Sequence, residues 1–211
     1  MKYMVVSWDY VDALCKRIAI DILKDGFDPD LIVALAKGGW FVGSILSDYL
    51  GSELVSLDIR KDRRIEGGKV LVVDDFINTG STMRKGLELI TARELRTAAL
   101  LMLEDSDFIP HYLGEYMMDY AWVIFPWNFV EDLSNLVLEI LKEGEVSQSK
   151  LKREMMDRGL DPITLDVAFP GRFEELMGVL EIKGFVEKRV DDGRVYWRIC
   201  DDRCGGRDAH S

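Results

Sequence analysis

Hydrophobic residues recur with a helical period in some stretches of the chain and form unbroken runs in others. Between residues 8 and 25, apolar side chains return every three or four positions, which predicts an amphipathic helix that ends at Gly26. A continuous apolar run at 31–36 stops at Lys-Gly-Gly, which is typical of a buried parallel strand. The two patterns together indicate helices packed on a buried sheet.

The same patterns continue over the first 130 residues. They predict helices at 40–50 and 80–94, and strands at 53–59, 69–75, 98–103 and 121–127. Strands that alternate with helices imply right-handed crossovers and a parallel sheet with helices on both faces. Ligands bind such sheets at the carboxyl ends of the strands. Three strands end in Lys37-Gly38-Gly39, Asp74-Asp75 and Glu104, and we expect these ends to meet at one crevice.

The pattern changes after Pro126. Helices are predicted at 131–142, from Ser147 onward, and at 172–183, and two alternating strands joined by Asp-Asp-Gly follow as a hairpin. This order is typical of a winged-helix module. We therefore predict an α/β domain at 1–130, a small winged-helix-like α+β domain at 131–200, and a flexible tail at 201–211.

The charge balance narrows the possible partners. The 211 residues carry a net charge of −11, and an acidic surface repels nucleic acid and anionic membranes. The amino terminus lacks a signal-peptide pattern, and no apolar stretch approaches the length of a membrane span. Three cysteines without metal-type spacing suit a reducing compartment. The sequence thus predicts a cytoplasmic protein that binds neither nucleic acid nor membrane.

The strongest chemical signal is VLVVDDFINTGSTM at residues 70–83. Asp74 and Asp75 follow a buried strand, where carboxylates can accept hydrogen bonds from sugar hydroxyls or from a magnesium-bound water. The loop 78–82 then supplies small residues, hydroxyls and a glycine just before a helix, which suits a phosphate held by backbone N–H groups. One short segment therefore provides a site for a sugar diol and a site for a phosphate, and the two sites are about the length of one ribose apart.

This segment resembles the 5-phosphoribosyl diphosphate (PRPP) motif of type I phosphoribosyltransferases, and the resemblance extends over about residues 1–130. By resemblance, PRPP binds Ala36, Lys37, Gly38, Gly39, Asp74, Asp75, Asn78, Thr79, Gly80, Ser81 and Thr82. Residues 60–68 match the family's mobile catalytic loop in position. Residues 120–127 are similar to the base-binding segment of the 6-oxopurine enzymes, with Val123 under the base and the backbone around Trp122 at the purine edge.

The resemblance implies that a base and PRPP give a nucleoside 5′-monophosphate and pyrophosphate, with Mg²⁺ at Asp74 and Asp75, directly or through water. Lys37, Arg60 and Lys61 are then expected to stabilise the leaving pyrophosphate. Members of the family often donate a loop residue across a dimer interface. A homodimer or larger assembly is therefore expected, in which Arg60 and Lys61 can serve the neighbouring subunit.

Two departures from the 6-oxopurine pattern concern the base. Asn78 stands where those enzymes usually carry a third acid, and an amide cannot act as a general base. Glu104 stands where they place a lysine that donates to O6, and an ionised carboxylate only accepts. We therefore predict adenine as the base, with Glu104 accepting from its amino group. The alternatives are a 6-oxopurine (hypoxanthine, guanine or xanthine), or an offset of one position that leaves Glu104 facing solvent beside Asp105 and Asp107.

Two other classes of function compete with the enzyme. A transcription regulator that senses PRPP or a purine would use the winged helix on DNA, but residues 131–211 hold 13 Lys and Arg against 18 Asp and Glu. A non-catalytic binding protein would not need the complete set of Lys37, Asp74, Asp75 and the loop 79–82. The sequence favours the enzyme over both.

Overall fold

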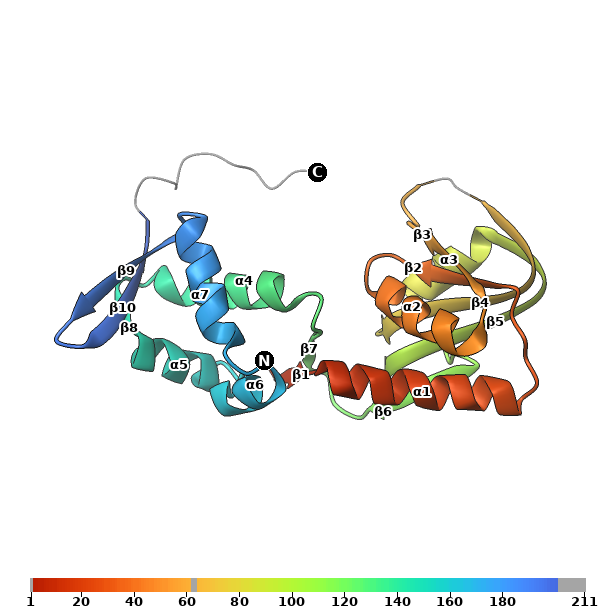
Figure 1. Ribbon diagram of the computed structural model, residues 1–211, viewed down its shortest axis with the longest axis horizontal. Coiled ribbons are helices and arrows are strands. Elements are labelled where there is room, and N and C mark those ends of the chain that lie inside the picture. The colour runs from red at the N-terminus through yellow and green to blue at the C-terminus, as the bar shows by residue number, and fades with distance from the viewer. Residues whose placement is uncertain (1, 62–63, 201–211) are drawn as a thin grey trace. The chain divides into compact units, whose positions relative to one another are not determined.

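The computed structural model describes residues 2–61 and 64–200, and the chain divides into two compact units (Figure 1). One unit spans Trp8–Tyr120, and the other joins the first seven residues to the chain from Ala121 onward. The division thus falls ten residues before the boundary predicted at 130. The expected tail at 201–211 lies outside the described residues.

The first unit is built on a parallel sheet of five strands in the order β3-β2-β4-β5-β6. Its strands are β2 (Leu31–Leu35), β3 (Glu53–Leu57), β4 (Ile65–Ile77), β5 (Ile90–Leu103) and β6 (Tyr112–Met117). Its helices are α1 (Trp8–Lys24), α2 (Gly38–Leu50) and α3 (Ser81–Glu88). The predicted α/β class, a parallel sheet that carries helices, is confirmed.

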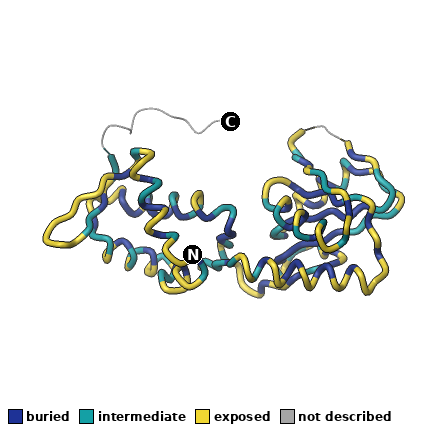
Figure 2. The backbone as a smooth tube through the Cα atoms, viewed as in Figure 1, coloured by how far each residue is buried: buried dark blue, intermediate teal, exposed yellow. Residues whose placement is uncertain are grey.

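Two glycines show that helices cover both faces of this sheet. A β-carbon at Gly43 of α2 would meet the side chains of Ala34 and Val73, whereas one at Gly86 of α3 would meet Leu35. Successive residues of a strand point to opposite faces, so α2 and α3 lie on opposite sides. Figure 2 shows the strands between them as the buried centre of the unit.

The central strands are longer than the apolar runs that predicted them. Residues 90–94, expected as the end of a helix, are the start of β5, and the expected helix ends at Glu88. β4 and β5 pair from Ile65 opposite Ile90 to Ile77 opposite Met102. The prediction was wrong here because the strand is fixed by hydrogen bonds to a neighbour that local periodicity does not reveal. Strand β6 was not anticipated.

The second unit contains a short parallel pair and an antiparallel sheet in the order β8-β10-β9. Its strands are β1 (Tyr3–Val5), β7 (Trp122–Ile124), β8 (Val146–Ser147), β9 (Val186–Asp191) and β10 (Arg194–Ile199). Its helices are α4 (Phe129–Leu141), α5 (Gln148–Asp157), α6 (Pro162–Ala168) and α7 (Arg172–Ile182). Pairing of β7 with β1 explains why residues 121–130 group with this unit.

Local signals at the ends of these elements match the structure. The hydroxyl of Ser147 accepts from the N–H of Lys150 at 3.2 Å and caps α5. Asp192 and Gly193 have positive φ angles of 44° and 70°, as a tight hairpin turn requires. Helix α6, which was not predicted, begins at an Asp161 cap. The winged-helix interpretation of this unit stays a prediction.

No helix among the described residues is both long and apolar enough to cross a membrane.

Candidate active site

The carboxyl ends of β2 and β4 meet as predicted. A β-carbon at Gly38 would lie only 1.6 Å from Oδ2 of Asp75. A β-carbon at Gly39 would lie 2.5 Å from the main-chain oxygen of Val73. The acidic pair therefore sits directly against the Lys37-Gly38-Gly39 sequence, which begins α2, and the Ala36–Lys37 peptide bond is cis. Only glycine allows this close approach.

The two aspartates have different surroundings. Asp74 is 7% exposed, and its Oδ1 accepts from the N–H of Asp75 at 3.0 Å. Burial and the adjacent charge of Asp75 together raise the pKa of Asp74 well above the usual range of an aspartate. Asp75 is half-buried. A hydroxyl donor or a cation at this point would stabilise the ionised form of Asp74, which burial disfavours.

The segment after β4 forms a turn that leads into α3. Gly80 has a φ of 78° at the start of the helix, and the N–H of Ser81 donates to Oγ1 of Thr79 at 3.4 Å. Arg84 donates to the carbonyl of Thr79 at 3.0 Å and holds the turn from within the helix. The side chains of Thr79 and Ser81 are exposed, so the turn presents hydroxyls and unpaired helix N–H groups to a ligand.

The loop after β5 packs against this turn. A β-carbon at Gly80 would lie 2.2 Å from Cβ of Phe108, and the guanidinium of Arg84 lies 5.8 Å from the Phe108 ring centre. Glu104, just past the end of β5, is exposed, and its N–H donates to the carbonyl of Met117. Sequence reasoning missed Arg84 and Phe108. An arginine in the first turn of the helix was the available signal for one of them.

The predicted catalytic loop begins with a compact ion pair. Arg60 directs Nε and Nη2 at the two carboxylate oxygens of Asp58, at 2.9 and 3.0 Å. Nζ of Lys61 lies 3.9 Å from the same carboxylate. The Arg60 guanidinium lowers the pKa of Asp58 to about 2. Asp58 was not among the predicted residues, and it holds the arginine that we expect to bind pyrophosphate.

Trp122 and Val123 belong to the other compact unit. Both lie in β7, where the N–H of Trp122 donates to the carbonyl of Lys2. A hydrogen bond from the Trp122 side chain to Asp132 opposes the rise in the pKa of Asp132 that burial causes. Their role in base binding stays a prediction.

Comparison with known proteins agrees with this geometry. Residues 59–129 match the model of the phosphoribosyl transferase domain. An orotate phosphoribosyltransferase of Oceanobacillus iheyensis is 27% identical over 68% of this chain and 73% of its own length. A xanthine-guanine phosphoribosyltransferase of Gluconobacter oxydans is 26% identical over 60% and 84%. The crystal structure of a purine phosphoribosyltransferase from Pyrococcus horikoshii is 25% identical, with a TM-score of 0.50 over 60% and 95% of the two chains.

The chain therefore contains a phosphoribosyl transferase domain and has the fold of the type I phosphoribosyltransferases. Phosphoribosyltransferases generally use Mg²⁺ together with PRPP. Among the described residues no group of three or more acidic, histidine or cysteine side chains could hold a metal ion alone. Asp74 and Asp75 still fit Mg²⁺, because this ion is usually bound through one or two carboxylates plus water and substrate phosphates.

Proposed function

We propose that this phosphoribosyltransferase joins adenine to PRPP and releases AMP and pyrophosphate. The observation that carries the proposal is the contact of Asp75 with Gly38, beside the turn at 79–82. It brings groups suited to a diol, to pyrophosphate and to a 5′-phosphate to one edge of the sheet. A further carboxylate, that of Glu104, follows the neighbouring strand β5 and can accept from an amino group.

The expected chemistry depends on positioning. A ring nitrogen of the base attacks C1 of the ribose as the bond from C1 to the pyrophosphate oxygen breaks, and the proton leaves the base. Asp74 and Asp75 orient the ribose hydroxyls, and Lys37 with the N–H groups of Gly38 and Gly39 binds the departing charge. Mg²⁺ held by the two aspartates would add positive charge near the pyrophosphate. Asn78 cannot take the proton, so water is the simplest acceptor.

The proposal is tested by assaying the full chain with PRPP, Mg²⁺ and one base at a time: adenine, hypoxanthine, guanine, xanthine and orotate. Adenine is expected to give the highest kcat/KM. The names of the relatives make xanthine and guanine the main alternative, with orotate the next. Turnover of those bases without adenine would overturn the adenine assignment and keep the reaction class. Absence of turnover with all five would overturn both.

Glu104 gives the sharpest test of base choice. Replacing Glu104 with lysine puts a donor where the proposal needs an acceptor, so the ratio of kcat/KM for adenine to that for hypoxanthine should fall at least about a hundredfold. In Glu104→Gln, which keeps an acceptor oxygen, the same ratio of kcat/KM values should fall less. Asp105→Lys is the matched control, because it makes the same charge change one position further on. An equal response to Asp105→Lys would show that only net charge matters.

Arg60 tests the leaving-group role and the predicted dimer. Arg60→Ala should lower kcat by about tenfold or more, because a charge-assisted contact to pyrophosphate is lost. If the loop acts on the neighbouring subunit, mixing the impaired Arg60→Ala and Asp75→Asn proteins should raise activity to roughly a quarter of the wild-type value in a two-fold dimer, above that of either variant alone. Analytical ultracentrifugation measures the oligomeric state of the protein independently of activity. Failure of a stable dimer to regain activity would place Arg60 in its own subunit's site.

A homodimer and a cytoplasmic setting remain part of the proposal. Cys15, buried in α1, has a pKa raised by burial to about 12 and is a structural thiol. The substrates and products are PRPP, a purine base, a nucleoside monophosphate and pyrophosphate.

A further inference from the structure

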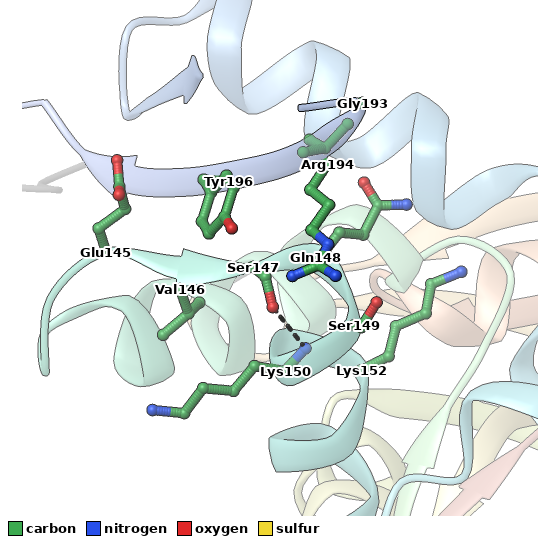
Figure 3. Close-up of a pocket in the computed structure, with 11 residues that line it drawn as sticks. Glu145, Val146, Ser147, Gln148, Ser149, Lys150, Lys152, Gly193, Arg194 and Tyr196 are labelled. Atoms are coloured by element: carbon green, nitrogen blue, oxygen red, sulfur yellow. Dashed lines mark hydrogen bonds between the residues drawn. The ribbon is translucent and has the colours of Figure 1, made fainter. Parts of the chain in front are cut away.

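A pocket of about 810 Å³ lies within the second unit, where β8, the first turn of α5 and the start of β10 come together. Figure 3 shows Arg194 reaching from the hairpin toward Ser147 and Ser149 at the start of α5, with Tyr196 beside it. The volume suits a drug-sized or nucleotide-sized ligand. No residue of the PRPP site lines it.

The pocket is positively charged although the unit around it is acidic. Of its cationic side chains, Lys152 pairs with Glu174 at 3.1 Å. Within residues 2–61 and 64–200, Lys150 and Arg194 form no ion pair. The one acidic side chain of the lining, Glu145, is already neutralised by the forked guanidinium of an arginine at 2.7 and 3.0 Å. Two cations therefore remain available to a ligand.

The polar groups of the lining are arranged as donors. The side-chain oxygen of Gln148 accepts from the indole N–H of buried Trp197 at 3.3 Å, which turns the amide NH₂ of Gln148 away from that bond. Oγ of Ser147 already accepts from the N–H of Lys150, so its proton is free to donate. The N–H groups of Gln148 and Ser149 lie in the first turn of α5, where helices have no internal acceptors. Donors and cations together select an anion with several oxygens.

An aromatic ring stands next to these donors. Tyr196 is directly opposite Ser147 in the antiparallel pairing, and Arg194 precedes it by two positions, so all three side chains share one face of the sheet. Arg189 lies 4.5 Å from the centre of the Tyr196 ring. A half-buried ring beside Arg194 suits a ligand that combines a planar base with phosphate.

We propose that this pocket binds a nucleoside phosphate, at a site separate in sequence from the PRPP motif. A nucleic-acid strand fits less well, because residues 131–211 carry a net charge of −5 and α7 presents exposed Glu174 and Glu175. A hollow with two free cations suits one compact anion rather than a run of backbone phosphates. The site is independent of whether adenine is the substrate.

NMR of the ¹⁵N-labelled full chain, titrated with AMP, inorganic phosphate and a DNA duplex at constant ionic strength, tests the proposal. AMP should shift the amide signals of Gln148, Ser149 and Arg194. The double variant Lys150→Glu with Arg194→Glu should weaken this response about tenfold or more, since two charged donors are lost. Arg153→Glu is the matched control, because Arg153 is exposed on the same helix and does not line the pocket.

The amides of residues 78–82 distinguish this site from the catalytic one. Their response to AMP should be unchanged in the double variant. AMP shifts confined to residues 78–82 in the wild type would overturn the proposal, as would an equal loss of the pocket response in Arg153→Glu. If inorganic phosphate bound as tightly as AMP, the base would contribute nothing to binding. The ligand would then be a phosphate rather than a nucleoside phosphate, and the proposal would be overturned. If DNA saturated the shifts of the same amide signals at a lower concentration than AMP, the surface would be a nucleic-acid site and the proposal would be overturned.

Discussion

Replacing Asp74 with asparagine is expected to impair phosphoribosyl transfer severely while raising the free energy of unfolding of the protein. Asp74 is 7% exposed and its carboxyl lies beside that of Asp75, so its ionised form is disfavoured in the fold. Asparagine keeps the oxygen that accepts from the N–H of Asp75. It cannot ionise, so it avoids the cost of burying a charge, and the free energy of unfolding should rise by about 1–3 kcal/mol at neutral pH. Activity should fall at least about a hundredfold, because the ribose loses an oriented acceptor.

The effect should depend on pH in a defined direction. Because folding raises the pKa of Asp74, the stability that its protonated form contributes is complete below the unfolded pKa and is lost as pH rises through the folded pKa. The advantage of Asp74→Asn over the wild type should therefore be absent below about pH 3.9 and grow above it. Urea unfolding at several pH values measures this. Asp28→Asn, at an exposed carboxylate, is the control. An advantage that is the same at every pH would contradict the account.

The second large effect is expected at the two glycines that meet the acidic pair. A β-carbon at Gly38 would lie 1.6 Å from Oδ2 and 2.1 Å from Cγ of Asp75, so Gly38→Ala must displace this carboxylate. A shift of about 1 Å can cost a hundredfold in rate, and kcat/KM should fall by about that factor. The half-buried side chain of Asp75 can move, so the loss of stability should be small.

Gly39→Ala should behave in the opposite way. Its β-carbon would lie 2.5 Å from the main-chain oxygen of Val73, in a central strand that cannot yield. We expect a loss of about 1–3 kcal/mol in the free energy of unfolding. Gly178→Ala is the control, because nothing lies within 4 Å of its β-carbon in α7, and it should gain about 0.5–1 kcal/mol. Equal loss of stability in Gly38→Ala and Gly39→Ala would contradict the separate roles assigned to them.

Groups of the substrate can stabilise the ionised Asp74 carboxylate, which burial in the fold disfavours. In the proposed function, the cost of burying the Asp74 carboxyl becomes useful when ribose hydroxyls or Mg²⁺ stabilise its ionised form. In the proposed function, the ion pair of Asp58 with Arg60 is a similar case on the exposed loop, since the arginine would exchange one anion for another when PRPP binds. Both arrangements connect the chemistry of the site to features of the unliganded fold.

The amino-acid sequence by itself determined the type of fold and the main segment of the candidate site. The apolar run of β4, the Asp74-Asp75 pair and the turn at 78–82 follow one another in the chain, so their arrangement depends on local rules of strand, turn and helix. The cap at Ser147 and the turn at Asp192-Gly193 were predictable for the same reason.

The tertiary structure alone decided which distant residues touch. The contact of Gly38 with Asp75, the packing of Phe108 on Gly80, and the extension of β5 back to Ile90 all arise from neighbours far away in sequence. The pairing of β7 with β1 likewise moved the domain boundary to residue 120. Periodicity describes how a segment buries one face, whereas hydrogen bonding and packing between strands depend on the partner. That partner is known only once the chain has folded.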